Sequence, residues 1–239
     1  MTANDTHEQI TIIEHEAACH AGWLLETLTG EGSRVDIRRL HAGEALPRVE
    51  EFCDLAGLIV LGGSMNADQT GEFPFLEPER RLLAAAVEAD LPLLGICLGA
   101  QQLAAATGGR VYARTEPEVG WLPIEIVRGD PLLRTLGSPF EAFEWHGQSF
   151  DVSSGSEVLA LRPPDDGVQA FRVGRRAWGV QFHPEVDESI LRAWVRRDTK
   201  GLRRRDPDLL ARVSEAVPRI AADSKELCRR LVQNFVASL

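Results

Sequence analysis

The chain has 239 residues, of which 44% are hydrophobic and 26% charged, an ordinary globular mix that excludes collagen-like and wholly disordered proteins. Its 26 basic and 36 acidic residues give a net charge of −10, which argues against a general binder of nucleic acid. The apolar runs are far shorter than the about 18 residues of a membrane-spanning helix, and the polar N-terminus MTANDTHEQ lacks the pattern of a secretory signal.

The first part of the chain alternates short buried-strand runs with helical patterns. The strand-like runs are ITII (10–13), RVDIRRL (34–40), LAGLIVLGG (55–63) and LPLLGIC (91–97). The intervening helical patterns cover 19–28, 77–89 and 98–109. This alternation predicts an α/β fold with an open, mainly parallel sheet of the flavodoxin-like kind, flanked by helices. Such a sheet places its active site outside the carboxyl ends of the strands.

The pattern changes from about residue 110. Short strand-like runs separated by turn residues predict an antiparallel insertion; they are RVYAR, GWLPIEIV, FEAFEWHG, EVLALR, VQAFRVG and AWGVQFH. Helices are predicted over 187–198, 207–217 and 222–238, the last with an apolar stripe of Leu227, Leu231 and Phe235. Because no repeat or long linker interrupts the chain, we expect one domain over residues 1–239.

The cysteines and histidines are the first candidates for chemistry. Cys19, Cys53, Cys97 and Cys228 are scattered and show no CxxC spacing. A disulfide framework or a zinc ribbon is therefore not expected, and the sequence predicts a reduced, cytoplasmic protein. Six histidines are available as a base or a ligand, at positions 7, 15, 20, 41, 146 and 183.

The most informative motif surrounds Cys97, in the run LGICLGAQ (94–101). A buried strand runs into Cys97 and a helix begins at once, with Gly95 and Gly99 where a nucleophile elbow leaves no room for side chains. The free amides and the dipole at the start of the helix would lower the pKa of the thiol. An isolated cysteine is more often a buried structural residue, but the flanking glycines favour a nucleophile.

His183 follows the strand-like run WGVQF (178–182) and precedes Pro184 and Glu185. Side chains two residues apart point the same way in an extended chain, so Glu185 can hydrogen-bond one ring nitrogen and fix the tautomer of the other. His183 could then act as the base that a thiol nucleophile requires. The alternatives are a capped strand end or a metal-binding His-x-Glu pair. No cluster supplies the remaining ligands, so we expect no metal.

Two motifs together carry a resemblance. The runs GICLGAQ (95–101) and GVQFHPE (179–185) resemble the class I glutamine amidotransferase domain, which uses a Cys-His-Glu triad. The spacing between them and the LGG turn at 61–63 also match. The resemblance covers about residues 8–195, which leaves a helical C-terminal extension over about 196–239.

The resemblance implies roles for individual residues. Carried over by position, Cys97 would be the nucleophile, His183 the base and acid, and Glu185 the orienting carboxylate. It also implies oxyanion amides at Gly63 and Leu98 and a glutamine contact at Gln101.

Other motifs resemble one branch of the family, the free-standing proteins similar to the amidotransferase part of GMP synthase. These are GW (120–121) and EWHGQSF (144–150), and in that branch such a segment lines the glutamine pocket. His146, Gln148 and Ser149 are therefore candidate substrate-binding residues. A polar group at a strand end is an equally good interpretation of His146. Members of this branch often carry an acidic residue where Gln148 stands.

The predicted reaction is hydrolysis of the γ-carboxamide of glutamine, or of a γ-glutamyl compound, through a Cys97 thioester. The released ammonia would pass to a separate synthetase. A free-standing γ-glutamyl peptidase or hydrolase is the first alternative, and a catalytically weak binding or regulatory protein on the same fold is the second. Because Ser153–Ser156 is too short for an SGGxDS-type phosphate loop, we expect neither ATP nor another cofactor.

The segment 192–205 carries seven basic side chains and one acidic, an unusual block in an acidic protein. It could contact a partner or an anion. A solvated helix face, with arginine stems lying over apolar residues, is the favoured interpretation.

Overall fold

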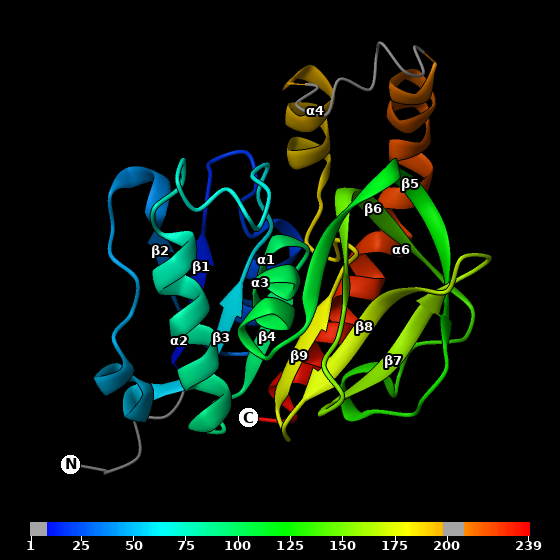
Figure 1. The fold of residues 1–239 in the computed structure, drawn as a ribbon. Coiled ribbons are helices and arrows are strands. Elements are labelled where there is room, and N and C mark those ends of the chain that lie inside the picture. Colours follow the sequence, from blue (N-terminus) through cyan, green and yellow to red (C-terminus); the bar gives the residue numbers. More distant parts are fainter. Residues whose placement is uncertain (1–8, 198–207) are drawn as a thin grey trace.

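The computed structural model describes residues 9–197 and 208–239, with only part of the side chains between 209 and 221 (Figure 1). Nine strands in this part of the chain form one sheet in the order β2-β1-β3-β4-β9-β8-β7-β5-β6. The parallel half consists of β1 (Gln9–Glu14), β2 (Arg34–Arg39), β3 (Leu55–Val60), β4 (Leu93–Ile96) and β9 (Ala177–Val180). The antiparallel half adds β5 (Arg110–Ile126), β6 (Phe140–Asp151), β7 (Ser156–Arg162) and β8 (Gly167–Val173).

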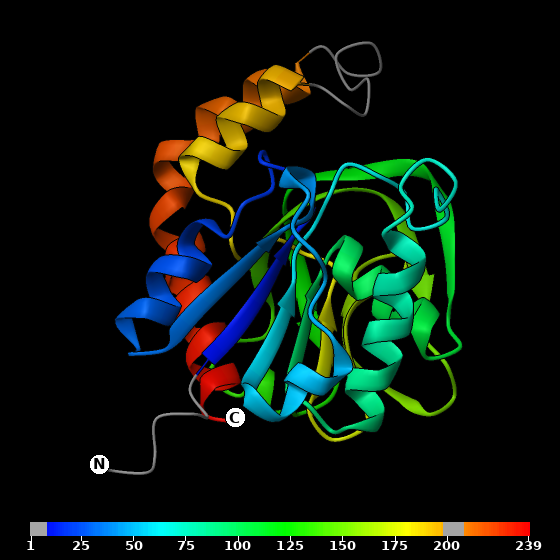
Figure 2. The ribbon, with the colours of Figure 1, turned by 90° about the vertical axis from the view of Figure 1, so that its left-hand side faces the viewer.

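Helices cover both faces of the parallel half. Helices α1 (Gly22–Gly30) and α6 (Leu209–Val236) lie on one face, and α2 (Leu76–Glu88) and α3 (Leu98–Ala106) on the other (Figure 2). Helix α4 (Glu188–Arg197) packs beside α6, and short 3₁₀ helices occur at Leu40–Ala42, Val49–Asp54 and Pro131–Leu133. None of the described helices is both long and apolar enough to span a membrane.

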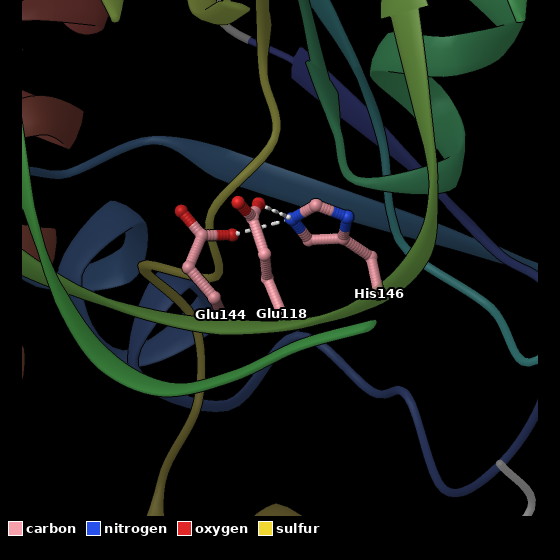
Figure 3. Close-up of side chains that lie close together, drawn as sticks. All are labelled: Glu118, Glu144 and His146. Carbon is pink, nitrogen blue, oxygen red and sulfur yellow. Dashed lines mark ion pairs between the residues drawn. The ribbon is translucent and has the colours of Figure 1, made fainter. Parts of the chain in front are cut away.

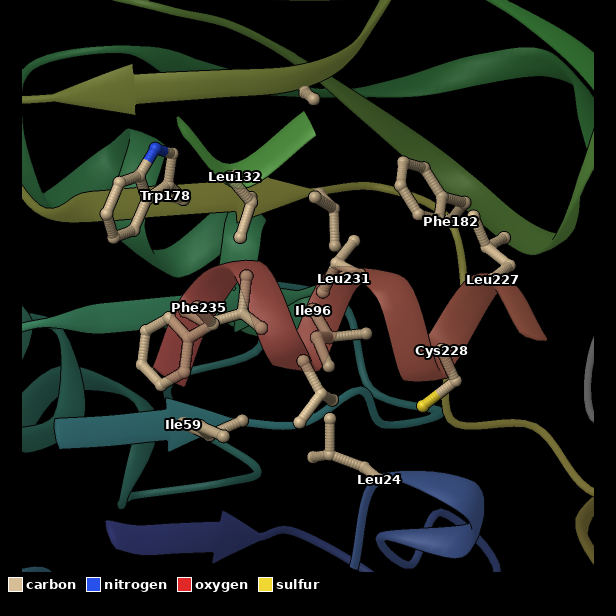
Figure 4. Packing of buried hydrophobic residues seen from close by; sticks show 14 of the residues in the cluster. Leu24, Ile59, Ile96, Leu132, Trp178, Phe182, Leu227, Cys228, Leu231 and Phe235 are labelled. Carbon is tan, nitrogen blue, oxygen red and sulfur yellow. The ribbon is translucent and has the colours of Figure 1, made fainter. Parts of the chain in front are cut away.

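The core is divided between the two faces because the central strands are buried on both sides. In and just after β3, Ile59 and Leu61 pack with α1 and α6, whereas Leu58 and Val60 pack with α2 and α3. The predicted stripe of Leu227, Leu231 and Phe235 on α6 is buried in the first of these clusters (Figure 4). Continuous apolar runs are typical of parallel strands covered on both faces.

The predicted fold class is confirmed, and the differences lie in the extent of the elements. The runs expected as two strands at 110–114 and 120–127 form the single strand β5, which is interrupted by a bulge between Ala113 and Glu118. With this long strand, the antiparallel half has as many strand pairings as the parallel half. The helices predicted at 207–217 and 222–238 are one continuous helix, α6.

Helix α1 begins at Gly22 rather than at residue 19. The reason is tertiary: Gly22 has φ +43°, and a Cβ there would lie 2.1 Å from the carbonyl oxygen of Glu185. The next residue, Trp23, donates its backbone N–H to that same carbonyl at 3.0 Å. The start of α1 is therefore packed against the loop after β9, which also carries His183.

Candidate active site

Cys97 lies at a sharp turn between β4 and α3, with φ +50° and ψ −103°. A positive φ is rare for a residue with a Cβ and costs about 1–3 kcal/mol, so the surrounding structure must hold it. Two close contacts do so: a Cβ on Gly95 would lie 2.6 Å from the Gly99 carbonyl, and one on Gly99 would lie 2.2 Å from the Val60 carbonyl. The elbow predicted from the flanking glycines is the observed backbone geometry.

His183 and Glu185 follow β9, the strand that pairs in parallel with β4. Nδ1 of His183 is hydrogen-bonded to Oε1 of Glu185 at 2.7 Å, and both side chains are buried. The other ring nitrogen, Nε2, is also buried and has no nitrogen or oxygen partner in the described part of the chain, which leaves it available to the Cys97 sulfur. The backbone N–H of His183 donates to the carbonyl of Phe143 at 2.8 Å, which anchors the loop to β6.

The electrostatics of the pair favour charge separation. Burial alone would raise the pKa of the Cys97 thiol, but the charge and hydrogen bond of His183, helped by His146, lower it below its usual value. Burial alone would lower the pKa of His183, but Glu185 and Cys97 raise it well above the ordinary value. A thiolate beside an imidazolium is the reactive form of such a pair.

Gly63 and Leu98, the residues expected to supply the oxyanion amides, both lie near Cys97. Gly63 lines the cavity that contains Cys97, and Leu98 is the first residue of α3. The hydrogen bonds found among the described residues use neither the N–H of Gly63 nor that of Leu98. Gly62, the residue before Gly63, lies close to both His183 and Cys97. A Cβ at this position would be 3.0 Å from Cε1 of His183 and 3.5 Å from Cβ of Cys97. Two free amides at such a position can stabilise an oxyanion.

A small cavity opens on Cys97. Three of the predicted substrate-binding residues, Gln101, His146 and Gln148, line it together with Gly63, Met65, Asn66, Trp145 and Gly147. Gln101 donates through Nε2 to the backbone carbonyl of Gln148 and to Oε1 of Gln181, both at 3.2 Å. Ser149 is not among the lining residues; its hydroxyl accepts a hydrogen bond from Arg114 at 3.1 Å.

Gln148 joins the cavity wall to the loop after β3. Its Oε1 accepts the backbone N–H of Ala67 at 2.9 Å, and its Nε2 donates to Oδ1 of Asp68 at 3.1 Å. A carboxylate at position 148 would have no N–H to donate to Asp68. The amide of Gln148 does, so Asp68 can be accommodated in the loop beside it.

His146 belongs to a buried ionic cluster with Glu118 and Glu144 (Figure 3). Its Nε2 lies 2.8 Å from Glu118 and 3.1 Å from Glu144, while its Nδ1 lies 2.8 Å from the carbonyl of Gln148. Burial alone would lower the pKa of His146, but its carboxylate partners raise it to about 9. Since every group near the ring nitrogens is an acceptor, His146 is a cation that donates from Nδ1 to the Gln148 carbonyl and forms ion pairs through Nε2.

The same three side chains are close enough together to hold a metal ion. However, their ligand atoms already form ion pairs, and Glu118 is also paired with Arg114 at 2.9 Å and Arg162 at 2.6 Å. The cations already present neutralise the carboxylates without a metal. The cluster therefore fits a structural and electrostatic role beside the cavity.

A second cavity lies on the His183 side of the site. It shares Gly63 and Trp145 with the first, and it is also lined by Glu16, Cys19, Ser64, Trp194 and Arg197. Trp194 packs edge-on against His183, with ring centroids 4.8 Å apart. Glu16 and Arg197 form an ion pair of 2.6 Å at its rim. Cys97 and His183 therefore lie between two cavities.

The predicted basic segment is only partly described. Arg192 pairs with Glu188 on the same helix, and Arg197 pairs with Glu16. Residues 198–205 of that segment lie outside the described residues.

Sequence reasoning missed two buried residues behind the site, His15 and Glu79. His15 follows β1 directly, and Glu79 lies in the first turn of α2. Nε2 of His15 is hydrogen-bonded to Glu79 at 2.6 Å, and its Nδ1 to the carbonyl of Gly62 at 3.0 Å. The available signal was the position of His15 at the carboxyl end of a parallel strand, the same sheet edge that carries Cys97.

Comparison with known proteins is consistent with this geometry. The family model described as glutamine amidotransferase class-I matches residues 21–196. A glutamine amidotransferase-like protein of Salmonella typhimurium, YfeJ, is 31% identical over 202 residues, covering 81% of this chain and 82% of that protein. The GMP synthase of Aeropyrum pernix is 30% identical over 189 residues, covering 76% of this chain but only 34% of the synthase.

Solved structures agree. A glutamine amidotransferase of Thermotoga maritima superposes with a TM-score of 0.85 at 28% identity, covering 96% of this chain and 98% of that one. A structure from Methylobacillus flagellatus matches in fold, with a TM-score of 0.82 at 24% identity over 97% and 95% of the two chains. The resemblance inferred from the motifs is confirmed, and the chain belongs to the class I glutamine amidotransferase family.

Proposed function

We propose that this protein hydrolyses a γ-glutamyl amide, with glutamine as the simplest substrate, through a thioester on Cys97. The observation that carries the proposal is the arrangement around the elbow. Cys97 is held at a positive φ beside His183, and His183 is hydrogen-bonded to Glu185 at 2.7 Å. A nucleophile, a base and an orienting carboxylate in this order form the triad that acyl transfer requires.

The steps follow from the positions of the groups. The Cys97 thiolate attacks the γ-carbonyl carbon, and the amides of Gly63 and Leu98 stabilise the oxyanion; each such donor contributes on the order of 3 kcal/mol. The His183 imidazolium gives its proton to the leaving nitrogen, so the C–N bond breaks and ammonia departs. Neutral His183 then takes a proton from water, whose oxygen attacks the thioester. Glutamate leaves and the thiol is regenerated.

The cavity on Cys97 would hold the glutamyl part of the substrate. Its polar wall is fixed in advance, because Gln101 and Gln148 each hydrogen-bond to groups from other elements. Side chains that are already held in place lose little conformational freedom on binding, which favours affinity. We assign no direct substrate contact to Ser149, because its hydroxyl is bonded to Arg114 and does not line the cavity.

The test is ammonia release from L-glutamine by the purified chain, with glutamate measured in parallel. Wild type should release both in equal amounts, and Cys97→Ala should release neither. Cys53→Ala is the matched control, because Cys53 is free and exposed. Mass spectrometry of wild type should find a γ-glutamyl adduct on the Cys97 peptide alone, with an added mass of about 129 units, which is the mass of glutamine less that of ammonia. Ammonia release by Cys97→Ala equal to wild type would refute the proposal.

A second candidate is a free-standing γ-glutamyl hydrolase or peptidase, favoured by the cavity on the His183 side. His183 delivers its proton to the leaving nitrogen, so a substituent on that nitrogen would point toward this cavity. Trp145 and Trp194 line it, and both could pack against an apolar or aromatic substituent. The comparison is kcat/KM for glutamine against γ-glutamyl dipeptides, where preference for the dipeptides would identify the second candidate.

The fate of the ammonia distinguishes the two candidates further. The chain matches about a third of the length of the Aeropyrum pernix GMP synthase. If the chain is an amidotransferase subunit, a separate synthetase would take up its ammonia. Addition of such a partner would then raise glutaminase activity, whereas a free-standing hydrolase would be fully active alone.

A further inference from the structure

His15 is a buried histidine that the proposed reaction does not use directly. It is 2% exposed and follows β1, at the sheet edge where the parallel strands end. Nδ1 lies 3.0 Å from the carbonyl oxygen of Gly62, and Nε2 lies 2.6 Å from Oε2 of Glu79. A carbonyl can only accept, so Nδ1 carries a hydrogen and donates it to Gly62.

The peptide that receives this hydrogen bond joins Gly62 to Gly63. It is trans, and in a planar trans peptide the C=O and the N–H point in opposite directions. Fixing the Gly62 oxygen toward His15 therefore turns the Gly63 N–H away from His15. Gly63 lines both cavities beside Cys97, and its N–H has no acceptor among the described residues.

We propose that His15 is a positioning residue: it holds the Gly62 carbonyl and thereby aims the Gly63 N–H at the oxyanion formed on the substrate of Cys97. The proposal rests on the proposed function, because it assigns a task within that reaction. Glycine at both positions makes such a support necessary, since a peptide between two glycines has wide conformational freedom when nothing holds it.

Glu79 extends the support to helix α2. Its carboxylate is fully buried, and His15 is stacked on Phe75 with ring centroids 5.7 Å apart. The charges that face the ring are Glu79 and, farther away, Glu16. Burial alone would lower the pKa of His15, but Glu79 raises it. A charged donor polarises the peptide that it binds, which strengthens the N–H at the other end as a donor.

The decisive variants first remove both ring nitrogens of His15 and then restore one donor. His15→Phe keeps an aromatic ring against Phe75 but removes the donor, and we expect kcat for glutamine or a γ-glutamyl amide to fall about 10²-fold with KM little changed. His15→Asn places an amide N–H near the position of Nδ1 and should restore at least a tenth of the wild-type kcat. His41→Asn is the matched control, since His41 pairs with Glu14 and lines neither cavity.

A second reaction distinguishes aiming from general damage. Alkylation of Cys97 by iodoacetamide forms no oxyanion, so its rate in His15→Phe should stay within about twofold of wild type while hydrolysis falls about 10²-fold. Equal losses in alkylation and hydrolysis would mean that His15 supports only the fold. Undiminished kcat in His15→Phe would also overturn the proposal. If that variant does not fold, Glu79→Gln replaces it, with an expected loss of about tenfold in kcat and the same unchanged alkylation.

One measurement does not depend on substrate. The amide ¹⁵N resonance of Gly63 reports the hydrogen bond on the preceding carbonyl, and it should move in His15→Phe and return toward wild type in His15→Asn. If wild type hydrolyses no γ-glutamyl compound, the proposed function fails, yet this resonance still decides whether His15 holds the peptide. A Gly63 resonance identical in wild type and His15→Phe would exclude the contact.

Discussion

The two halves of the sheet contribute to the site in different ways. In the parallel half, Cys97, His183 and Gly62 each follow the end of a strand, and the backbone sets their positions. In the antiparallel half, His146, Glu118 and Glu144 lie within long paired strands, and ion pairs set their positions. The first half supplies the proposed reacting groups, and the second supplies a charged wall beside them. The strand topology therefore determines where the proposed reacting groups lie, whereas ion pairs between charged side chains determine the electrostatic environment beside them.

The largest expected effect is the loss of the nucleophile in the parallel half. Cys97→Ala should lower hydrolysis on the order of 10⁶-fold and keep the fold, because alanine also has a Cβ at this strained turn. Cys19→Ala, Cys53→Ala and Cys228→Ala should retain activity; their thiols are free, and burial holds the pKa of Cys228 far above its usual range. Steady-state hydrolysis measures the activity of each variant, and thermal unfolding shows whether its fold is kept. Labelling of another cysteine by a glutamine-analogue electrophile would contradict the assignment.

Loss of the base should cost nearly as much, and loss of the orienting carboxylate less. His183→Ala removes the proton acceptor and leaves Glu185 buried without its partner, so we expect hydrolysis to fall about 10⁵-fold or more. Glu185→Gln keeps the shape but removes the charge, and a loss on the order of 10⁴-fold is expected. The double variant should be no worse than His183→Ala, because the two residues act as one unit. If the two activation free-energy losses were instead additive in the double variant, His183 and Glu185 would act independently.

His146 tests the charged wall of the antiparallel half, with a smaller expected effect. His146→Gln removes a buried cation whose charge lowers the pKa of Cys97. The pH at which iodoacetamide reacts half-maximally with Cys97 should rise by about one unit. The rate of alkylation at pH 7 should then fall by up to about tenfold. Peptide mass spectrometry separates this cysteine from the exposed Cys53. An unchanged profile would confine His146 to a structural role.

The same histidine should make stability depend on pH. Its pKa is raised from 6.5 to about 9 in the folded protein, so folding holds its proton more tightly than the unfolded chain does. The resulting stabilisation is complete below about pH 6.5 and is lost as the pH rises through about 9. The free energy of unfolding in urea should therefore fall more steeply over that range in wild type than in His146→Gln. Parallel curves for the two proteins would argue that the ring is neutral.

The smallest expected effect is that of a chelator or a nucleotide on the purified chain. The proposed triad supplies its own base, and the carboxylates near His146 already have cationic partners. Hydrolysis should change less than about twofold with EDTA or with ATP. If the chelator abolished activity and a divalent ion restored it, the ionic cluster around His146 would be identified as a metal site. Micromolar binding of ATP to the chain alone would reveal a nucleotide site that the motifs do not show.

Much of the reacting half could be predicted because its signals are local. The apolar runs identify the strands, and the glycines around Cys97 mark an elbow whose close contacts are with Gly99 and Val60. The spacing of His183 and Glu185 predicts their hydrogen bond, since residues two apart in extended chain share a side. Element ends were less predictable: α1 starts where Gly22 meets the Glu185 carbonyl, a contact between distant residues.

The sequence by itself thus determined the α/β class, the family and the turn that presents Cys97, because periodicity, turn chemistry and short spacings act between near neighbours. Only the tertiary structure decided which charges meet. A bulge in β5 and its register with β6 place Glu118 opposite His146. His15 reaches Gly62 across 47 positions and Glu79 across 64. Such contacts depend on strand register and on where a helix settles on the sheet, and no local pattern encodes either.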